Sequence, residues 1–297
     1  MFKPFAKEGA KLLGAGAGPT AQLSTSELKA ALEATGDDAL SVLADLLQSA
    51  GDPWGELIAL RLAEEDDLAE QHFRRHIVSL QGGLPHRDLG WRHGVVAEAS
   101  FRGTTGQLRA HLDALSKLRT AGRIEVLSLS GSVGRQVLEA LSSWAPKSLR
   151  SLELDGEVLG LDALALPNLE HLQLDLNTTV QGLTAAKLPR LSHLWIRTRK
   201  AIRAEVLTEL LEWPTLRKLR RLDFDEHSTQ VRTLDDAGVA ALLAAAPRLT
   251  PLKALWVELA NRALSPAVQR AATSFLAPRR KRALKEDERA PEPWFDE

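Results

Sequence analysis

Two histidines, His171 and His193, stand at the same place in two successive copies of a short apolar pattern, and Asp175 follows the first of them. If the two copies form neighbouring strands, the Cβ atoms of the histidines lie about 5 Å apart. Two imidazoles with a carboxylate nearby are groups that can hold a metal ion or respond to pH. A contact surface that contains histidines requires no third ligand, and we therefore expect a binding surface without a metal ion.

Aromatic and charged side chains occupy equivalent places in the same pattern. Trp195 and Trp256 each lie between two aliphatic residues that a strand directs to its opposite face. A large ring in water costs free energy unless something covers it, and tryptophan and arginine are enriched at the centres of interfaces. The alternative is that the rings lie flat on the sheet or that another segment covers them. The residues that we expect to bind a protein partner are Trp195, Trp256, His171, His193, Arg197, Arg221, Asp223, Glu153 and Asp175.

The sequence contains no recognisable catalytic motif. It has no Gly-x-Ser-x-Gly nucleophile motif, no His-Glu-x-x-His zinc motif and no complete phosphate-binding loop. The carboxylates Glu153, Asp155 and Asp175 could cluster, but an open sheet offers them no desolvated pocket that would raise a pKa. We therefore expect no enzyme activity, no small-molecule substrate and no cofactor.

The elements that position these residues are predicted by an apolar spacing that occurs six times. Apolar residues fill the first, fourth and sixth places of each copy, and a strand sends the fourth and sixth inward and the third, fifth and seventh outward. The longer segments between copies have helical spacing, and the shorter ones do not. The segment at 96–101 fits as a degenerate first copy. The six copies are Ile124/Leu127/Leu129, Leu149/Leu152/Leu154, Leu169/Leu172/Leu174, Leu191/Leu194/Ile196, Leu219/Leu222/Phe224 and Leu252/Leu255/Val257.

One such copy cannot bury its apolar edge alone, whereas stacked copies bury a continuous core. The spacing is therefore that of a leucine-rich repeat. The predicted fold is α/β, a leucine-rich-repeat solenoid with a parallel concave sheet, a mixed helical and irregular convex side, and a small helical domain before it.

The helical domain is predicted by capping residues and by a resemblance. Asp52 and Pro53 are typical of the N-cap and first turn of a helix. The segment 51–60, Gly-Asp-Pro-Trp-Gly-Glu-Leu-Ile-Ala-Leu, together with residues 43–47, resembles the bacterial repeat-companion domain that precedes leucine-rich repeats. Trp54 stands where that domain usually has an arginine. The resemblance implies a bacterial leucine-rich-repeat protein, and it implies no activity.

Composition excludes several classes of function. With 297 residues, of which 44% are hydrophobic, the chain can bury a large core. A formal net charge of -1 gives no overall attraction to nucleic acid or anionic lipid. The absence of cysteine excludes disulfides and thiolate zinc sites and fits a reducing compartment. The first residues form no apolar run as long as a signal peptide or a membrane span, so we expect a cytoplasmic protein.

The sequence predicts four segments: a disordered lead over 1–20, the helical domain over 21–85, the solenoid with a C-terminal cap helix over 86–277, and a disordered charged tail over 278–297. The predicted function is a non-catalytic protein–protein interaction module, an adaptor, scaffold or sensor subunit. The alternative is a nucleic-acid-associated protein that uses the basic run 279–282. Acidic residues follow this run and no aromatic residue interrupts it, which favours a solvated tail.

Overall fold

The computed structural model describes residues 37–177, 180, 182–199, 202, 204–225, 234, 236–245 and 254–257, the last four by their backbone alone. The predicted lead, cap helix and tail lie outside these residues. The chain divides into two compact units, with the division between Leu80 and Gln81. Within the described part, no helix is long and apolar enough to cross a membrane.

From residue 37 onward, the first unit forms the helices α2 (Asp37–Ser49), α3 (Pro53–Leu62) and α4 (Asp66–Gln81). The predicted cap is confirmed, because a side-chain oxygen of Asp52 accepts a hydrogen bond from the backbone N–H of Trp54 at 3.0 Å. Helices α2 and α3 pack closely, since a Cβ on Gly55 would lie 2.3 Å from the backbone nitrogen of Gln48. The indole of Trp54 is buried in this helical core.

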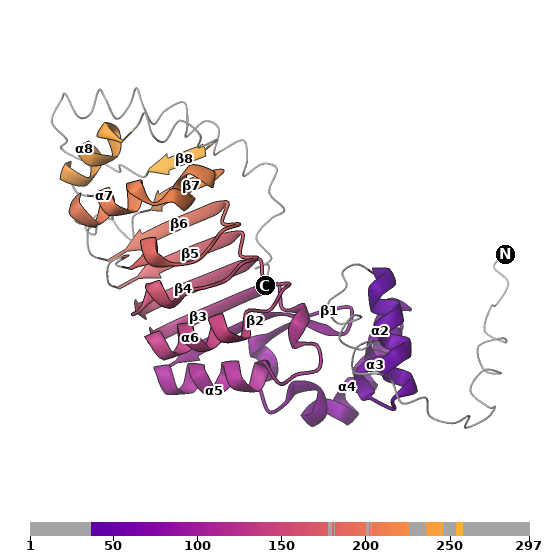
Figure 1. Ribbon diagram of the computed structural model, residues 1–297. Coiled ribbons are helices and arrows are strands. Elements are labelled where there is room, and N and C mark those ends of the chain that lie inside the picture. Colours follow the sequence, from indigo (N-terminus) through magenta and orange to yellow (C-terminus); the bar gives the residue numbers. More distant parts are fainter. Residues whose placement is uncertain are drawn as a thin grey trace, which may run out of the picture. The chain divides into compact units, whose positions relative to one another are not determined.

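The second unit contains one sheet of eight strands that follow one another in chain order (Figure 1). The first strand is antiparallel to the second, and every later pair is parallel. This arrangement confirms an α/β fold with a mostly parallel sheet. The strands are β1 (Leu89–Arg92), β2 (Val95–Gly103), β3 (Val126–Val133), β4 (Ser151–Val158), β5 (His171–Leu176), β6 (His193–Thr198), β7 (Arg221–Asp225) and β8 (Ala254–Val257).

The register of the parallel strands aligns the predicted apolar positions in columns. The fourth positions of β3 to β7 pair directly with one another, and so do the sixth positions. All ten side chains are at most 2% exposed, so each contributes roughly 1.5–3 kcal/mol of burial free energy. The predicted inward and outward alternation is therefore confirmed for these strands. The two columns are Leu127, Leu152, Leu172, Leu194 and Leu222, and Leu129, Leu154, Leu174, Ile196 and Phe224.

The longer segments between strands form α-helices and the shorter ones form 3₁₀ turns, as predicted. Helices α5 (Thr105–Leu115), α6 (Arg135–Trp144), α7 (Ala204–Glu212) and α8 (Asp236–Ala244) follow β2, β3, β6 and β7. Single 3₁₀ turns, η4 (Leu161–Ala163) and η5 (Leu183–Ala185), follow β4 and β5. Figure 1 shows α5 and α6 side by side at the sheet, and α7 and α8 likewise. Further 3₁₀ turns, η2 (His86–Asp88), η3 (Ala121–Arg123) and η6 (Pro214–Lys218), precede β1, β3 and β7.

The start of the sheet differs from the sequence interpretation. The apolar period lapses over 81–94, and Gly82, Gly83 and Pro85 are typical of a connector. The segment nevertheless contains β1, which forms a hairpin with β2. The turn consists of His93 and Gly94, both at positive φ, which suits the twist of a two-residue hairpin. The strand was missed because it has only four residues and its alternation is interrupted by a shift in register. The antiparallel strand covers the edge of β2 that the repeats leave unpaired.

A column of glycines crosses the sheet beside the apolar columns. Gly103, Gly131 and Gly156 pair in register on β2, β3 and β4. The second and third have φ values of 104° and 108°, which side chains with a Cβ rarely adopt. A Cβ on Gly131 would lie 2.4 Å from the carbonyl oxygen of Gly103, and one on Gly156 equally close to that of Gly131. The backbones of the three strands therefore approach so closely that only glycine fits at Gly131 and Gly156.

Candidate binding face

The face of β3–β7 that carries the third, fifth and seventh positions is called the outward face here. Its residues pair across strands in rows that follow from the register. In the row of third positions, His171 pairs with His193, and His193 pairs with Arg221. In the row of fifth positions, Trp195 pairs with Asp223. The fold therefore brings most of the predicted binding residues together on adjacent strands. Trp256 is opposite Asp223 on β8, where only the backbone is described.

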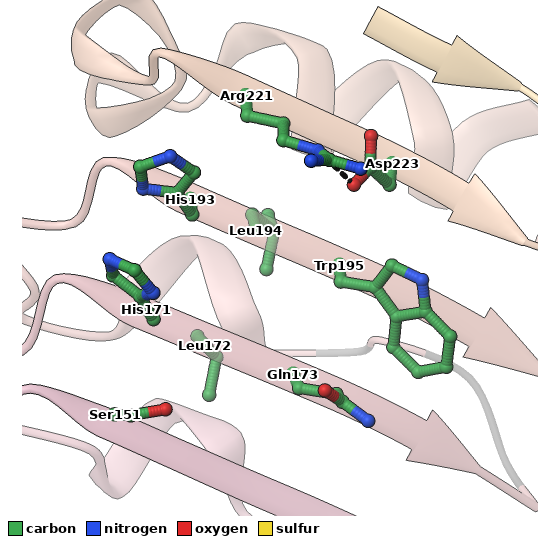
Figure 2. Close-up of a pocket in the computed structure, with 9 residues that line it drawn as sticks. All are labelled: Ser151, His171, Leu172, Gln173, His193, Leu194, Trp195, Arg221 and Asp223. Atoms are coloured by element: carbon green, nitrogen blue, oxygen red, sulfur yellow. Dashed lines mark hydrogen bonds and ion pairs between the residues drawn. The ribbon is translucent and has the colours of Figure 1, made fainter. Parts of the chain in front are cut away.

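A depression of about 280 Å³ lies on the outward face between the third and fifth rows (Figure 2). The two histidines form one wall, and Gln173 and Trp195 form the other. Sequence reasoning placed Gln173 and Ser151 outward but did not include them among the binding residues. The apolar spacing could have identified them, because Gln173 is the fifth position of its copy and Ser151 the third position of the copy before it. The remaining lining residues are Leu172, Leu194, Arg221 and Asp223.

Two predicted outward carboxylates are more buried than we expected. Asp175 is 8% exposed and Asp223 is 5% exposed. Each lies beside an arginine of the same face: Asp175 accepts a hydrogen bond from Arg197, and Asp223 accepts one from the Nε of Arg221 at 2.6 Å. The arginines cover the carboxylates and neutralise them. The position of a residue in its copy predicts the direction of its side chain, but it does not predict how far neighbouring side chains bury it.

Trp195 is half-buried, so its ring is covered more than an isolated outward side chain would be. The guanidinium carbon of Arg197 lies 4.9 Å from the centroid of the indole ring. A cation over an indole face contributes about 0.5–1 kcal/mol at such a site. The same guanidinium is held by Asp175 on the neighbouring strand. Arg197 therefore connects the indole ring to the buried carboxylate and limits the freedom of both arginine and ring.

The two histidine rings lie next to each other, with centroids 4.4 Å apart and planes tilted by 41°. Burial lowers the pKa of both imidazoles, and that of His193 falls to about 4. The positive charges of Arg221 and Arg220 lower the pKa of His193 further, as does His171. Glu170 acts in the opposite direction on His171. At neutral pH the two imidazoles are therefore uncharged.

The lowered pKa of His193 predicts a loss of stability on mild acidification. An unfolded chain protonates this imidazole near pH 6.5, whereas the folded chain does so only near pH 4. As the pH falls through this window the unfolded state binds more protons, and the free energy of unfolding decreases. We expect urea unfolding in metal-free buffer to give a lower value at pH 5.5 than at pH 7.5. A His193→Gln variant should show a smaller decrease, and an equal decrease in both proteins would contradict the assignment.

Glu153 corrects the expectation that this face cannot raise a carboxylate pKa. Burial raises the pKa of Glu153, and the nearby Asp155 and Asp175 add to the rise, while a hydrogen bond with Ser128 opposes it. The carboxylate also accepts a hydrogen bond from Gln173 at 3.2 Å. In-register pairing brings these carboxylates to adjacent strands, where they interact before any ligand is present. A raised pKa in a polar network is not sufficient for catalysis.

The carboxylate that we considered as a partner of the histidines lies elsewhere. Asp175 is in the seventh row and contacts Arg197, whereas the histidines are in the third row. Across the described residues, no three or more His, Cys, Asp or Glu side chains form a group that could hold a metal ion. A second histidine pair, His72 and His76, lies on α4, and the Nε2 of His72 lies 2.9 Å from the carbonyl oxygen of Pro53.

Comparison with known proteins adds no assignment to this geometry. No protein-family model matches the chain, and no curated protein is significantly similar to it. Any functional conclusion therefore depends on the residues of the outward face and on the fold that positions them.

Proposed function

We propose that the second unit is a leucine-rich-repeat solenoid and that a protein partner binds the outward face, which is then its concave face. The support is the regular register, in which each strand contributes the same two buried positions and the same three outward positions. Each strand pairs only with the strands before and after it in the sequence. Stacked units that contact only their neighbours are the defining property of such folds.

The single observation that carries the binding proposal is the position of Trp195 at the depression. The indole belongs to β6, an interior strand with β5 on one side and β7 on the other. The ring is held by Arg197, which is itself held by Asp175. A rigid aromatic residue beside a depression, surrounded by polar groups, is the usual composition of an interface hot spot. We therefore propose a non-catalytic adaptor, scaffold or sensor subunit of the bacterial cytoplasm.

The nucleic-acid alternative finds no support on this face. The outward positions of β4 to β7 carry five carboxylates, namely Glu153, Asp155, Asp175, Asp223 and Asp225, against two arginines, Arg197 and Arg221. A phosphate backbone would be repelled by this excess of negative charge. The basic run 279–282 lies outside the described residues, so nucleic-acid binding by the tail stays a prediction.

Replacing Trp195 by alanine should weaken partner binding by about tenfold or more, because loss of a central aromatic residue typically costs about 2 kcal/mol of binding. Stability should change by less, because the ring is only half-buried. The measurement is quantitative capture of proteins from a bacterial lysate by the tagged full chain, followed by titration of the purified partner. Thermal melting of both proteins measures the change in stability.

Leu159 provides a matched control for nonspecific adhesion. Its side chain is 55% exposed, and it follows β4 away from the depression. Leu159→Ala should leave partner capture unchanged. Equal capture by the parent chain and the Trp195 variant would remove this ring as an anchor. Equal losses in the two variants would show that capture depends on general hydrophobic contact and would contradict the proposal.

A further inference from the structure

The histidine pair at the edge of the depression has a geometry that partner binding does not require. His171 and His193 are direct cross-strand neighbours, and their ring centroids lie 4.4 Å apart. Figure 2 shows both rings on the outward face, at the same end of β5 and β6. His171 is exposed and His193 is partly exposed, so both rings are accessible from solvent.

A hydrogen bond with Ser192 engages one ring nitrogen of His193. The hydroxyl of Ser192 lies 3.1 Å from the carbonyl oxygen of Glu170 and 2.8 Å from the Nδ1 of His193. This hydrogen bond leaves Nε2 as the ring nitrogen that can bind an ion. Metal-binding histidines have this arrangement, in which one nitrogen is hydrogen-bonded to the protein and the other binds the ion.

We propose that His171 and His193 form a two-histidine site for a divalent transition metal ion, bound most tightly as Cu²⁺. Imidazole nitrogen is a preferred ligand of copper, zinc and nickel, and affinity for such a site increases along the series to copper. Calcium and magnesium require oxygen ligands, which this pair does not provide. Water completes the coordination, so positions on the ion stay open to an incoming ligand. The site does not depend on the proposed protein partner.

The other close histidine pair supplies an internal control. The rings of His72 and His76 have centroids 4.6 Å apart, almost the same separation. They differ because the Nε2 of His72 is hydrogen-bonded to the carbonyl oxygen of Pro53, which accepts and so requires a proton on that nitrogen. Proximity is thus similar in the two pairs, whereas His193 on the sheet has its protein hydrogen bond at Nδ1 and keeps Nε2 for an ion.

The test is titration of the full chain with Cu²⁺ alone, followed by calorimetry and by pulsed electron paramagnetic resonance. We expect one tight equivalent whose spectrum shows coupling to two imidazole nitrogens. His171→Ala and His193→Ala should each remove the two-nitrogen signal. Ser192→Ala should weaken binding by about tenfold or more, because the hydrogen bond between Ser192 and the Nδ1 of His193 no longer orients the ring. The double variant of His72 and His76 to alanine should bind copper as the parent chain does.

Circular dichroism and thermal melting of each variant separate loss of the site from loss of the fold. A folded His171→Ala variant that keeps the two-nitrogen signal would overturn the proposal. So would a parent chain that shows one nitrogen only, or a tight equivalent that disappears with the His72 and His76 variant. Because no protein partner enters these measurements, failure of the metal site would leave the partner proposal unaffected, and the reverse also holds.

Discussion

Replacing Gly131 by alanine is expected to destabilise the second unit by about 3 kcal/mol or more. The new Cβ would lie 2.4 Å from the carbonyl oxygen of Gly103, well inside van der Waals contact, and the φ of 104° adds backbone strain. The contact atom is backbone of a neighbouring strand, so no side chain can rotate away. The strands would have to separate, which weakens the β2–β3 ladder. Equilibrium unfolding in urea, followed by circular dichroism, measures the change.

Gly106 is the matched control for this substitution. It lies in α5, has no positive φ, and a Cβ there would have no atom within 4 Å. Gly106→Ala should be neutral or stabilise the chain by up to about 1 kcal/mol, because alanine favours the helix. If Gly131→Ala were as harmless as Gly106→Ala, the close approach of the three glycine backbones would be wrong.

Removing the carboxylate of Asp223 is the second substitution with a large expected effect. The Asp223 side chain is 7% exposed and that of Arg221 is 19% exposed. Asp223→Ala leaves the guanidinium in a poorly solvated position without this counterion, and we expect a loss of about 2–4 kcal/mol in the free energy of unfolding. The same urea experiment measures it.

Two further variants separate the ion pair from the loss of a side chain. The Arg221→Ala, Asp223→Ala double variant should lose no more stability than Asp223→Ala alone, because it also removes the poorly solvated guanidinium that the single variant deprives of this carboxylate. Glu139→Ala removes a carboxylate from an exposed pair with Arg135, and solvent screening makes the expected loss of stability much smaller than that of Asp223→Ala. A double variant that loses clearly more stability than Asp223→Ala alone would contradict the coupling between Arg221 and Asp223.

The sequence was sufficient for the strands and the direction of their side chains. Leu127 and Leu129 belong to one copy of the apolar spacing. The positions of the other copies predicted β3 to β7 and their outward residues. The helices α6 and α7 were predicted from apolar residues at helical spacing in the longer segments between copies. The apolar spacing predicts these strands well because the free energy gained by burying two large apolar side chains per strand outweighs the conformational preferences of the residues between them.

Features that depend on contact across strands could not be predicted in the same way. The pairing of Asp175 with Arg197 depends on a register that no single copy specifies. The spacing of one copy does not indicate that Gly131 and Gly156 contact the backbones of neighbouring strands. The hairpin strand β1 is short and irregular, so its pattern was too weak to distinguish it from a loop. Each case requires the position of the next strand.

The equal register of β4, β5 and β6 has a consequence for how the gene can change. His193 stands opposite His171, which itself stands opposite Ser151. Deleting residues 171–192 in frame would join Glu170 to His193 and place Leu194 beside Leu152 and Ile196 beside Leu154, with every apolar column intact. Duplication of the same stretch would add one strand by the same rule. The length of this sheet is therefore open to change in whole strands, and each added or removed strand also adds or removes one residue in each row of the face that we propose for binding.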